Sequence, residues 1–276
     1  MTLTLAYSPC PNDCFIFDAM IHGKVDTEGL TFDVRLEDVE TLNHMALRGA
    51  MDITKLSFHA YGHVLNNYIL LRAGSALGFN CGPLLIHNGN FDATKIELMK
   101  VAIPGKLTTA NFLLTLAYPH LKNKIELVFH EIEDAVLRGD VDAGLIIHEN
   151  RFTYEAKGLK KVQDLGEFWD GLIHAPIPLG GIVIKRNFDE DLQQKVNRVI
   201  KRSVEYAFAN PSSSLPYVRE HAQAMQEEVM KKHIDLYVNQ FSVDLGETGK
   251  HAVELLFNKA KEIGMFSAAD AKVMIA

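Results

Sequence analysis

The sequence predicts an α/β fold of two α/β lobes joined by crossing strands, with a cleft between the lobes. Three observations support it. Short β-like runs alternate with amphipathic helical runs over residues 3–65, and the same alternation returns over residues 100–147. A later apolar run, residues 178–186, is typical of a strand that crosses back to the first lobe.

The first half of the chain has the order strand, helix, strand, helix, strand. The strands are expected at residues 3–7, 30–38 and 51–57, and the helices at residues 14–23, 39–49 and, after the third strand, 58–65. Gly49 closes the second of these helices, because glycine readily adopts the left-handed conformation of a C-cap. This order predicts a mostly parallel sheet.

The same order begins again at residue 100. Strands are expected at residues 100–105, 124–131 and 141–147, and helices at residues 108–118 and 132–139. The segments LRGAMDITKLS and LRGDVDAGLIIH are the closest internal match, since each contains a helix end, a glycine, an aspartate and a strand. The matching order of five elements indicates a duplicated architecture.

The C-terminal part is predicted to be helical. Helices are expected at residues 189–209, 214–223, 225–239 and 246–264, with a turn at NPSSSLP. The spacing of Val196, Val199, Ile200 and Val204 favours one buried face. With these helices packed on the first lobe, residues 1–100 and 187–276 form a large lobe and residues 101–186 a small one.

Composition excludes several functions. The chain has 276 residues, 47% hydrophobic and 23% charged, as is typical of a soluble globular protein. Its net charge of −7 argues against non-specific nucleic-acid binding, which needs an excess of Lys and Arg. The N-terminus lacks the basic region of a signal peptide, and no segment has the apolar length of a membrane span. We therefore expect a cytoplasmic protein without nucleic-acid or membrane partners, for which an oligomer is compatible with the sequence.

The stretch GLIIHENRFTY places His148 and Glu149 directly after a predicted strand. His148 is either an inert histidine bonded to the backbone or a base, since an imidazole accepts a proton near neutral pH. If the strand continues, Glu149 points to the opposite side and could pair with Arg151. HENRF lacks the second histidine of HExxH, and His59 and His63 have no acid or cysteine at ligand spacing, so we expect a partly exposed helix there and no metal site.

Other polar residues follow the predicted strands. In open parallel sheets, ligands lie beyond the carboxyl ends of the strands and near helix N-termini. Ser8 belongs to the turn SPCPND, which we expect to line a ligand, with Cys10 as a less favoured nucleophile. Thr109, next to a second threonine, and Ser57 occupy mirrored positions, where capping and binding of a ligand carboxylate are compatible roles. Asn43 lies within a helix, where an exposed face is the favoured interpretation and a side chain that reaches the cleft is the alternative.

Neither GxGxxG nor GxxxxGK[ST] occurs, so no motif supports a nucleotide cofactor, and we expect no cofactor.

Seven segments together resemble the 1,4-dihydroxy-6-naphthoate synthases of the futalosine route to menaquinone. From about residue 3 to about residue 265 they are SPCPNDCFIFDAM, LEDVETLN, TKLSFHAYG, PGKLTTANFLL, AGLIIHENRFTY, DLGEFW and PLGGI. Cys14 departs from the pattern, which more often has Thr. The resemblance implies the fold of type II periplasmic solute-binding proteins.

The resemblance also implies a reaction and its site. The substrate would be cyclic dehypoxanthine futalosine, cleaved at a carbon–carbon bond into dihydroxyacetone and 1,4-dihydroxy-6-naphthoate. The proton acceptor of the family's GLIIHE motif falls on His148. The substrate contacts fall on Lys55, Leu56 and Ser57 of TKLS and on Thr109 and Ala110 of TTA. Two alternatives remain: chorismate dehydratase of the same pathway and fold, and a small-molecule binding protein without catalytic activity.

Overall fold

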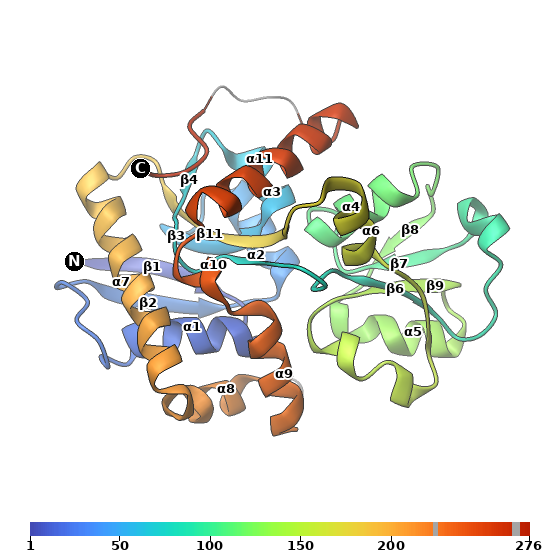
Figure 1. Ribbon diagram of the computed structural model, residues 1–276, viewed down its shortest axis with the longest axis horizontal. Helices are drawn as coiled ribbons and strands as arrows, with labels where there is room; N and C mark the ends of the chain where they lie inside the picture. The colour runs from blue at the N-terminus through green and yellow to red at the C-terminus, as the bar shows by residue number, and fades with distance from the viewer. Residues whose placement is uncertain (223–225, 267–270) are drawn as a thin grey trace. The chain divides into compact units, whose positions relative to one another are not determined.

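The computed structural model describes residues 1–222, 226–266 and 271–276 (Figure 1). The chain forms two compact units. Unit 1 comprises Met1–Gly78 and Pro178–Ala276, and unit 2 comprises Phe79–Ile177. Each unit has its own β-sheet covered by helices, which confirms the two-lobed α/β class.

The sheet of unit 1 has the strand order β2-β1-β3-β11-β4, with β5 beside β11. Its strands are β1 (Thr2–Tyr7), β2 (Thr31–Leu36), β3 (Ile53–Ser57), β4 (Tyr68–Leu70), β5 (Ala76–Gly78) and β11 (Ile177–Lys185). As predicted, β1 pairs in parallel with β2 and β3. β11 is the predicted returning strand, and it runs antiparallel to β3 and β4.

The helices of unit 1 surround this sheet. They are α1 (Pro11–Ile21), α2 (Val39–Leu47), α3 (Phe58–Val64), α7 (Glu190–Ala209), η5 (Pro211–Ser214), α8 (Leu215–His221), α9 (Glu227–Tyr237), α10 (Gln240–Val243) and α11 (Gly246–Glu262). The predicted apolar face of α7 is confirmed, because its four residues are fully buried in the core with α1 and β1. The predicted ends of two helices at Gln223 and Met225 lie outside the described residues.

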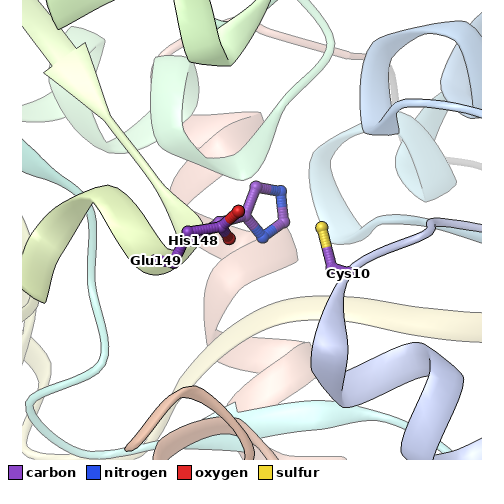
Figure 2. Close-up of side chains that lie close together, drawn as sticks. All are labelled: Cys10, His148 and Glu149. Carbon is purple, nitrogen blue, oxygen red and sulfur yellow. The ribbon is translucent and has the colours of Figure 1, made fainter. Parts of the chain in front are cut away.

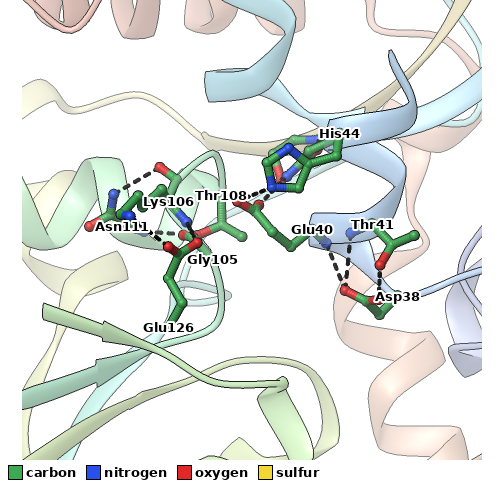
Figure 3. Close-up of polar contacts among 11 residues, drawn as sticks. Asp38, Glu40, Thr41, His44, Gly105, Lys106, Thr108, Asn111 and Glu126 are labelled. Carbon is green, nitrogen blue, oxygen red and sulfur yellow. Dashed lines mark hydrogen bonds and ion pairs between the residues drawn. The ribbon is translucent and has the colours of Figure 1, made fainter. Parts of the chain in front are cut away.

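Two helix starts show how local sequence sets the boundaries in unit 1. α1 begins at Pro11, three residues before the predicted start at Cys14, since a proline at the first helical position loses no hydrogen bond. α2 begins where predicted. There Asp38 Oδ1 accepts hydrogen bonds from the backbone N of Glu40 and of Thr41, at 3.0 and 3.2 Å (Figure 3).

The sheet of unit 2 has the order β10-β6-β9-β7-β8. Its strands are β6 (Leu84–His87), β7 (Val101–Ile103), β8 (Lys124–Glu126), β9 (Ala143–Ile146) and β10 (Lys160–Asp164). Its helices are η1 (Ala93–Leu98), α4 (Thr109–Ala117), η2 (Phe129–Glu131), α5 (Ile132–Arg138), η3 (His148–Phe152), η4 (Glu155–Lys157) and α6 (Leu165–Ile173). The predicted parallel pairing of β7 with β8 and β9 is present.

The unit boundaries differ from those expected. We expected the first crossing after Lys100 and the return after Arg186, whereas the units divide after Gly78 and after Ile177. The reason is β6, which pairs with β9 and β10 and so belongs to the second sheet.

None of the helices in the described ranges has both the length and the apolar character that a bilayer-spanning segment needs.

Candidate active site

The candidate residues form two groups, one in each unit. Unit 1 holds Ser8, Asn43, Lys55, Leu56 and Ser57, and unit 2 holds Thr109, Ala110 and His148. Most of them lie at or just beyond a strand end or at a helix start, as the sequence predicted.

Asp13, on α1, is the centre of a buried polar cluster in unit 1. Its Oδ2 accepts hydrogen bonds from the backbone N and Oγ of Ser8, at 3.2 and 2.7 Å. Its Oδ1 accepts from Asn12 Nδ2 and Lys55 Nζ, both at 2.8 Å. Lys55 Nζ also donates to the Gly74 carbonyl at 3.2 Å. The Asp13 and Lys55 residues are only 2% and 6% exposed, so this is a buried ion pair that also fixes Ser8.

Asn43 and Ser57 form a second buried pair. The backbone N of Ser57 donates to Asn43 Oδ1 at 2.9 Å, and Asn43 Nδ2 donates to Ser57 Oγ at 3.2 Å and to Glu40 Oε2 at 2.9 Å. Asn43 is fully buried, so the exposed helix face that the sequence favoured for it is wrong. Ser57 ends β3, and among the described residues its side chain makes no capping bond to α3. Asn43 therefore sets the orientation of Ser57.

The PLGGI segment lies against the TKLS segment. In the antiparallel pair of β11 and β3, Gly180 lies opposite Ser57 and Gly181 opposite Leu56. A Cβ atom at Gly180 would lie 3.1 Å from the Leu56 carbonyl oxygen and 3.3 Å from Lys55 Cε, tighter than ordinary contact. Glycine therefore allows β11 to approach the candidate contacts closely.

In unit 2, Thr109 and Ala110 are the first two residues of α4. Thr108, the residue before them, is the N-cap: its Oγ1 accepts from the backbone N of Asn111 at 3.1 Å and donates to the Gly105 carbonyl at 2.8 Å. Thr109 and Ala110 are almost fully buried. Backbone amides at a helix N-terminus favour negative charge, which is the physical basis of the role expected for this turn.

The turn before α4 is braced from two sides. Asn111 Nδ2 donates to the Lys106 carbonyl at 2.8 Å, and Lys124 Nζ donates to Asn111 Oδ1 at 3.0 Å. Lys106 Nζ lies 2.7 Å from Glu126 Oε1 on β8 (Figure 3). Burial lowers the pKa of Lys124 to about 8. Polar side chains thus hold the loop that leads into α4, where the candidate contacts Thr109 and Ala110 lie.

His148 follows β9 and begins η3 (Figure 2). Its φ of 58° lies in the left-handed region, which costs a residue with a side chain about 1–3 kcal/mol. Its ring packs edge-to-face on Phe129, with ring centroids 5.0 Å apart. His148 thus combines a left-handed backbone with a ring packed on an aromatic side chain.

The residues beside His148 differ from expectation. The strand does not continue, so the alternation that we applied to Glu149 does not hold. Arg151 Nη2 pairs with Asp164 Oδ2 at 2.8 Å, so the expected ion pair of Glu149 with Arg151 is wrong. Glu149 is 5% exposed; its burial, with a smaller effect of the Glu133 carboxylate, raises its pKa.

The structure also places Cys10 and His59, which were considered from the sequence, and Tyr154 of the stretch GLIIHENRFTY. Cys10 is the N-cap residue of α1 and is buried (Figure 2). His59 is buried beside Phe266, so the partly exposed helix that we expected holds only for His63. Tyr154 Oη donates to Glu155 Oε1 at 3.0 Å.

Sequence reasoning missed Asp13 and Glu133, although the first lies inside a quoted motif. Glu133 lies on α5 and is 1% exposed, and its Oε2 accepts hydrogen bonds from Asn150 Nδ2 and Lys157 Nζ, both at 2.7 Å. Asp13 follows Ser8 at five residues in SPCPND, a signal that could have identified it as the anchor of that turn.

Comparison with known proteins identifies the family of the chain. The family model for menaquinone biosynthesis matches residues 3–262. A 1,4-dihydroxy-6-naphthoate synthase from Thermus thermophilus is 46% identical over 263 residues, which cover 95% of each chain. The crystal structure of a protein from Archaeoglobus fulgidus has a TM-score of 0.91 and 34% identity, covering 96% of this chain and 98% of that one.

A more distant structure bears on the fold alone. A Candida albicans protein, described as having the generic periplasmic binding protein fold, has a TM-score of 0.71 at 14% identity and covers 98% of this chain and 92% of that one. The predicted fold type is therefore confirmed. With its match over nearly the whole chain and the high identity to the Thermus enzyme, this chain belongs to the menaquinone-biosynthesis family.

Proposed function

We propose that the chain cleaves cyclic dehypoxanthine futalosine into dihydroxyacetone and 1,4-dihydroxy-6-naphthoate, with His148 as general base. The chain is a carbon–carbon lyase of menaquinone biosynthesis, and the observation that carries this is its 46% identity to a naphthoate synthase over 95% of both chains. The identity of the substrate and the role of His148 are the parts that we propose. The biosynthetic role also supports a cytoplasmic location, which cell fractionation would test.

The proposed chemistry begins with a general base. His148 would remove a proton from a hydroxyl group of the sugar remnant, and the carbon–carbon bond would then break in a retro-aldol sense. The electron pair flows into the bicyclic ring system, which becomes aromatic as the three-carbon fragment leaves. General-base catalysis typically contributes about 10²–10⁴-fold, and positioning of the substrate supplies much of the rest.

The remaining candidates would hold the substrate. In unit 2 the amides at the start of α4, at Thr109, would bind the substrate carboxylate. In unit 1 the hydroxyl of Ser57 would offer the substrate a hydrogen bond. Lys55 Nζ has three N–H donors, and the contacts to Asp13 and Gly74 use two of them. Asn43 would hold Ser57 in position, and Ser8 would hold the turn through its hydrogen bond to Asp13.

The test is the variant His148→Ala with cyclic dehypoxanthine futalosine as substrate. We expect kcat to fall by about 10²–10⁴-fold while the Kd, measured by calorimetry, changes less than about tenfold, since a base acts mainly in the transition state. His120→Ala, an exposed histidine of the same unit, is the control and should behave as wild type. Wild-type turnover by His148→Ala would remove the residue from its role.

Two assays separate the alternatives. Loss of water from chorismate at a rate exceeding that of naphthoate formation would identify a chorismate dehydratase. Tight binding of the futalosine derivative without any product from the wild-type protein would identify a binding protein. Naphthoate and dihydroxyacetone formed in equal amounts would support the lyase.

A further inference from the structure

The left-handed backbone of His148 has to be held in place by its surroundings. Such a conformation persists only where neighbouring structure over-determines it. η3 begins at this residue, and its turn closes on Asn150, whose carbonyl accepts from the backbone N of Thr153 and of Tyr154, both at 3.1 Å. Asn150 is thus the residue that joins the start of η3 to the turn that follows.

Asn150 is in turn fixed to α5. Its Nδ2 donates to Glu133 Oε2 at 2.7 Å, and the two residues are only 7% and 1% exposed. α5 packs closely against β9. A Cβ atom at Gly144 of β9 would lie 2.5 Å from Ile132 Cγ2 and 2.8 Å from Val136 Cγ2, so the helix lies directly on the glycine. This close contact between helix and strand positions the carboxylate of Glu133.

Stability alone does not account for this carboxylate. Lys157 Nζ, on a half-exposed side chain, donates to the same Oε2 atom at 2.7 Å, and Oε1 of Glu133 has no hydrogen-bond partner among the described residues. A buried carboxylate oxygen left without a partner is costly. Apolar residues of similar volume often replace buried ion pairs without loss of stability. The pair fits a role in placing a neighbouring group.

We propose that Glu133 and Asn150 are positioning residues for His148: their hydrogen bond holds η3 so that the imidazole keeps its place after β9. The role of His148 in turnover rests on the proposed function, whereas its placement is a property of unit 2 alone. We expect the hydrogen bond, and not the charge of Glu133, to be the feature that matters, because the amide oxygen of a glutamine can still accept from Asn150.

Four variants test the pair. Glu133→Ala and Asn150→Ala remove the hydrogen bond. Glu133→Gln keeps an oxygen acceptor for Asn150 and removes the charge. Asp134→Ala is the matched control, since Asp134 is the next residue of α5 and is exposed. Far-UV circular dichroism and the fluorescence of Trp169, which lies in the same unit, check that each variant is folded.

In kinetics we expect Glu133→Ala and Asn150→Ala to lower kcat by tenfold or more while KM changes less than about threefold. Glu133→Gln should recover kcat to within about fivefold of wild type, and Asp134→Ala should match wild type. Folded alanine variants with wild-type kcat would overturn the proposal. An equal loss of kcat in Glu133→Gln and Glu133→Ala would also overturn it, since the charge of Glu133, and not its hydrogen bond, would then be the feature that matters.

A second readout needs no turnover. With ¹⁵N-labelled histidine, the imidazole resonances of His148, assigned by their loss in His148→Asn, should shift in both alanine variants and not in Asp134→Ala. Unchanged resonances in the alanine variants would overturn the positioning role. If the wild-type protein forms no naphthoate, the proposed function fails, and these spectra still decide whether the pair positions the ring.

Discussion

Removal of Lys55 should test whether the buried ion pair with Asp13 organises unit 1. In Lys55→Met the unbranched side chain keeps most of the packing while the charge is lost. Asp13 would then keep a buried carboxylate with three neutral donors, two from Ser8 and one from Asn12. The variant therefore isolates the effect of one partner of the pair.

The expected magnitude follows from these contacts. Breaking a buried pair by removing one partner costs about 3–5 kcal/mol. The three remaining donors still satisfy part of the carboxylate, so we expect the lower end, a loss of about 3 kcal/mol in the free energy of unfolding. Asp13→Asn should cost a similar amount. In the double variant neither charge is left unpaired, so we expect a coupling energy of about 2–3 kcal/mol.

The assay is urea unfolding at pH 7, followed by far-UV circular dichroism for both units. Trp169, the single tryptophan, lies in unit 2, so its fluorescence follows that unit separately and shows whether a two-state analysis applies. The matched control is Lys185→Met. Its Nζ lies 3.3 Å from Asp52 Oδ1, and both side chains are about a quarter exposed, at 27% and 24%. Removing that pair should cost no more than about 1 kcal/mol.

The reasoning would be refuted if Lys55→Met cost no more than Lys185→Met. It would also be refuted if the effects of Lys55→Met and Asp13→Asn were simply additive. Either result would mean that the carboxylate of Asp13 does not depend on the ammonium group.

Two further substitutions test unit 2. The raised pKa of Glu149 means that the folded state favours its protonated form, so the free energy of unfolding should fall as pH rises above the ordinary carboxyl range. Glu149→Gln should therefore be more stable than wild type at pH 8 in urea unfolding. This margin should shrink towards pH 4. A margin that is largest at pH 4 would contradict this sign. A Cβ atom at Gly82 would lie 2.2 Å from the backbone N of Gly166. Gly82→Ala should therefore lower the free energy of unfolding by about 3 kcal/mol or more in the same assay. Gly171→Ala is the control: a Cβ atom there meets nothing within 4 Å, so the free energy of unfolding should change by less than about 1 kcal/mol.

Periodicity predicted the elements that carry the site. The strands that end at Ser57 and just before His148, and the helix that begins at Thr109, were all located from alternating and helical patterns. β6 and β10 were missed. LLIH is only four residues long and KKVQD has few apolar positions, so neither has the pattern of a half-buried strand. Because these strands were missed, the predicted unit boundary lay too far along the chain: β6 is the first strand of the second sheet.

Burial of individual polar residues could not be predicted from spacing. Glu133 and Asp134 are neighbours on one helix with the same charge, yet the first is buried and the second exposed. Asn43 was expected on an exposed face and is fully buried. What decides these cases is a partner distant in the sequence, Asn150 for Glu133 and Ser57 for Asn43. The left-handed φ of His148 could not be predicted either, because glycine and asparagine are the usual residues in that conformation.

A carboxylate suits the anchoring role found in both units for a simple reason. It only accepts hydrogen bonds and offers about four lone-pair sites, so one acid can gather donors from several segments. Asp13 joins the turn after β1 to Lys55 on β3, and Glu133 joins η3 to Lys157 at the end of η4. An amide in place of Asp13 would present a donor to N–H or O–H groups, because both oxygens of this carboxylate accept hydrogen bonds. The desolvation cost of each acid is thus accepted where a candidate contact or the candidate base has to be held to within a fraction of an ångström.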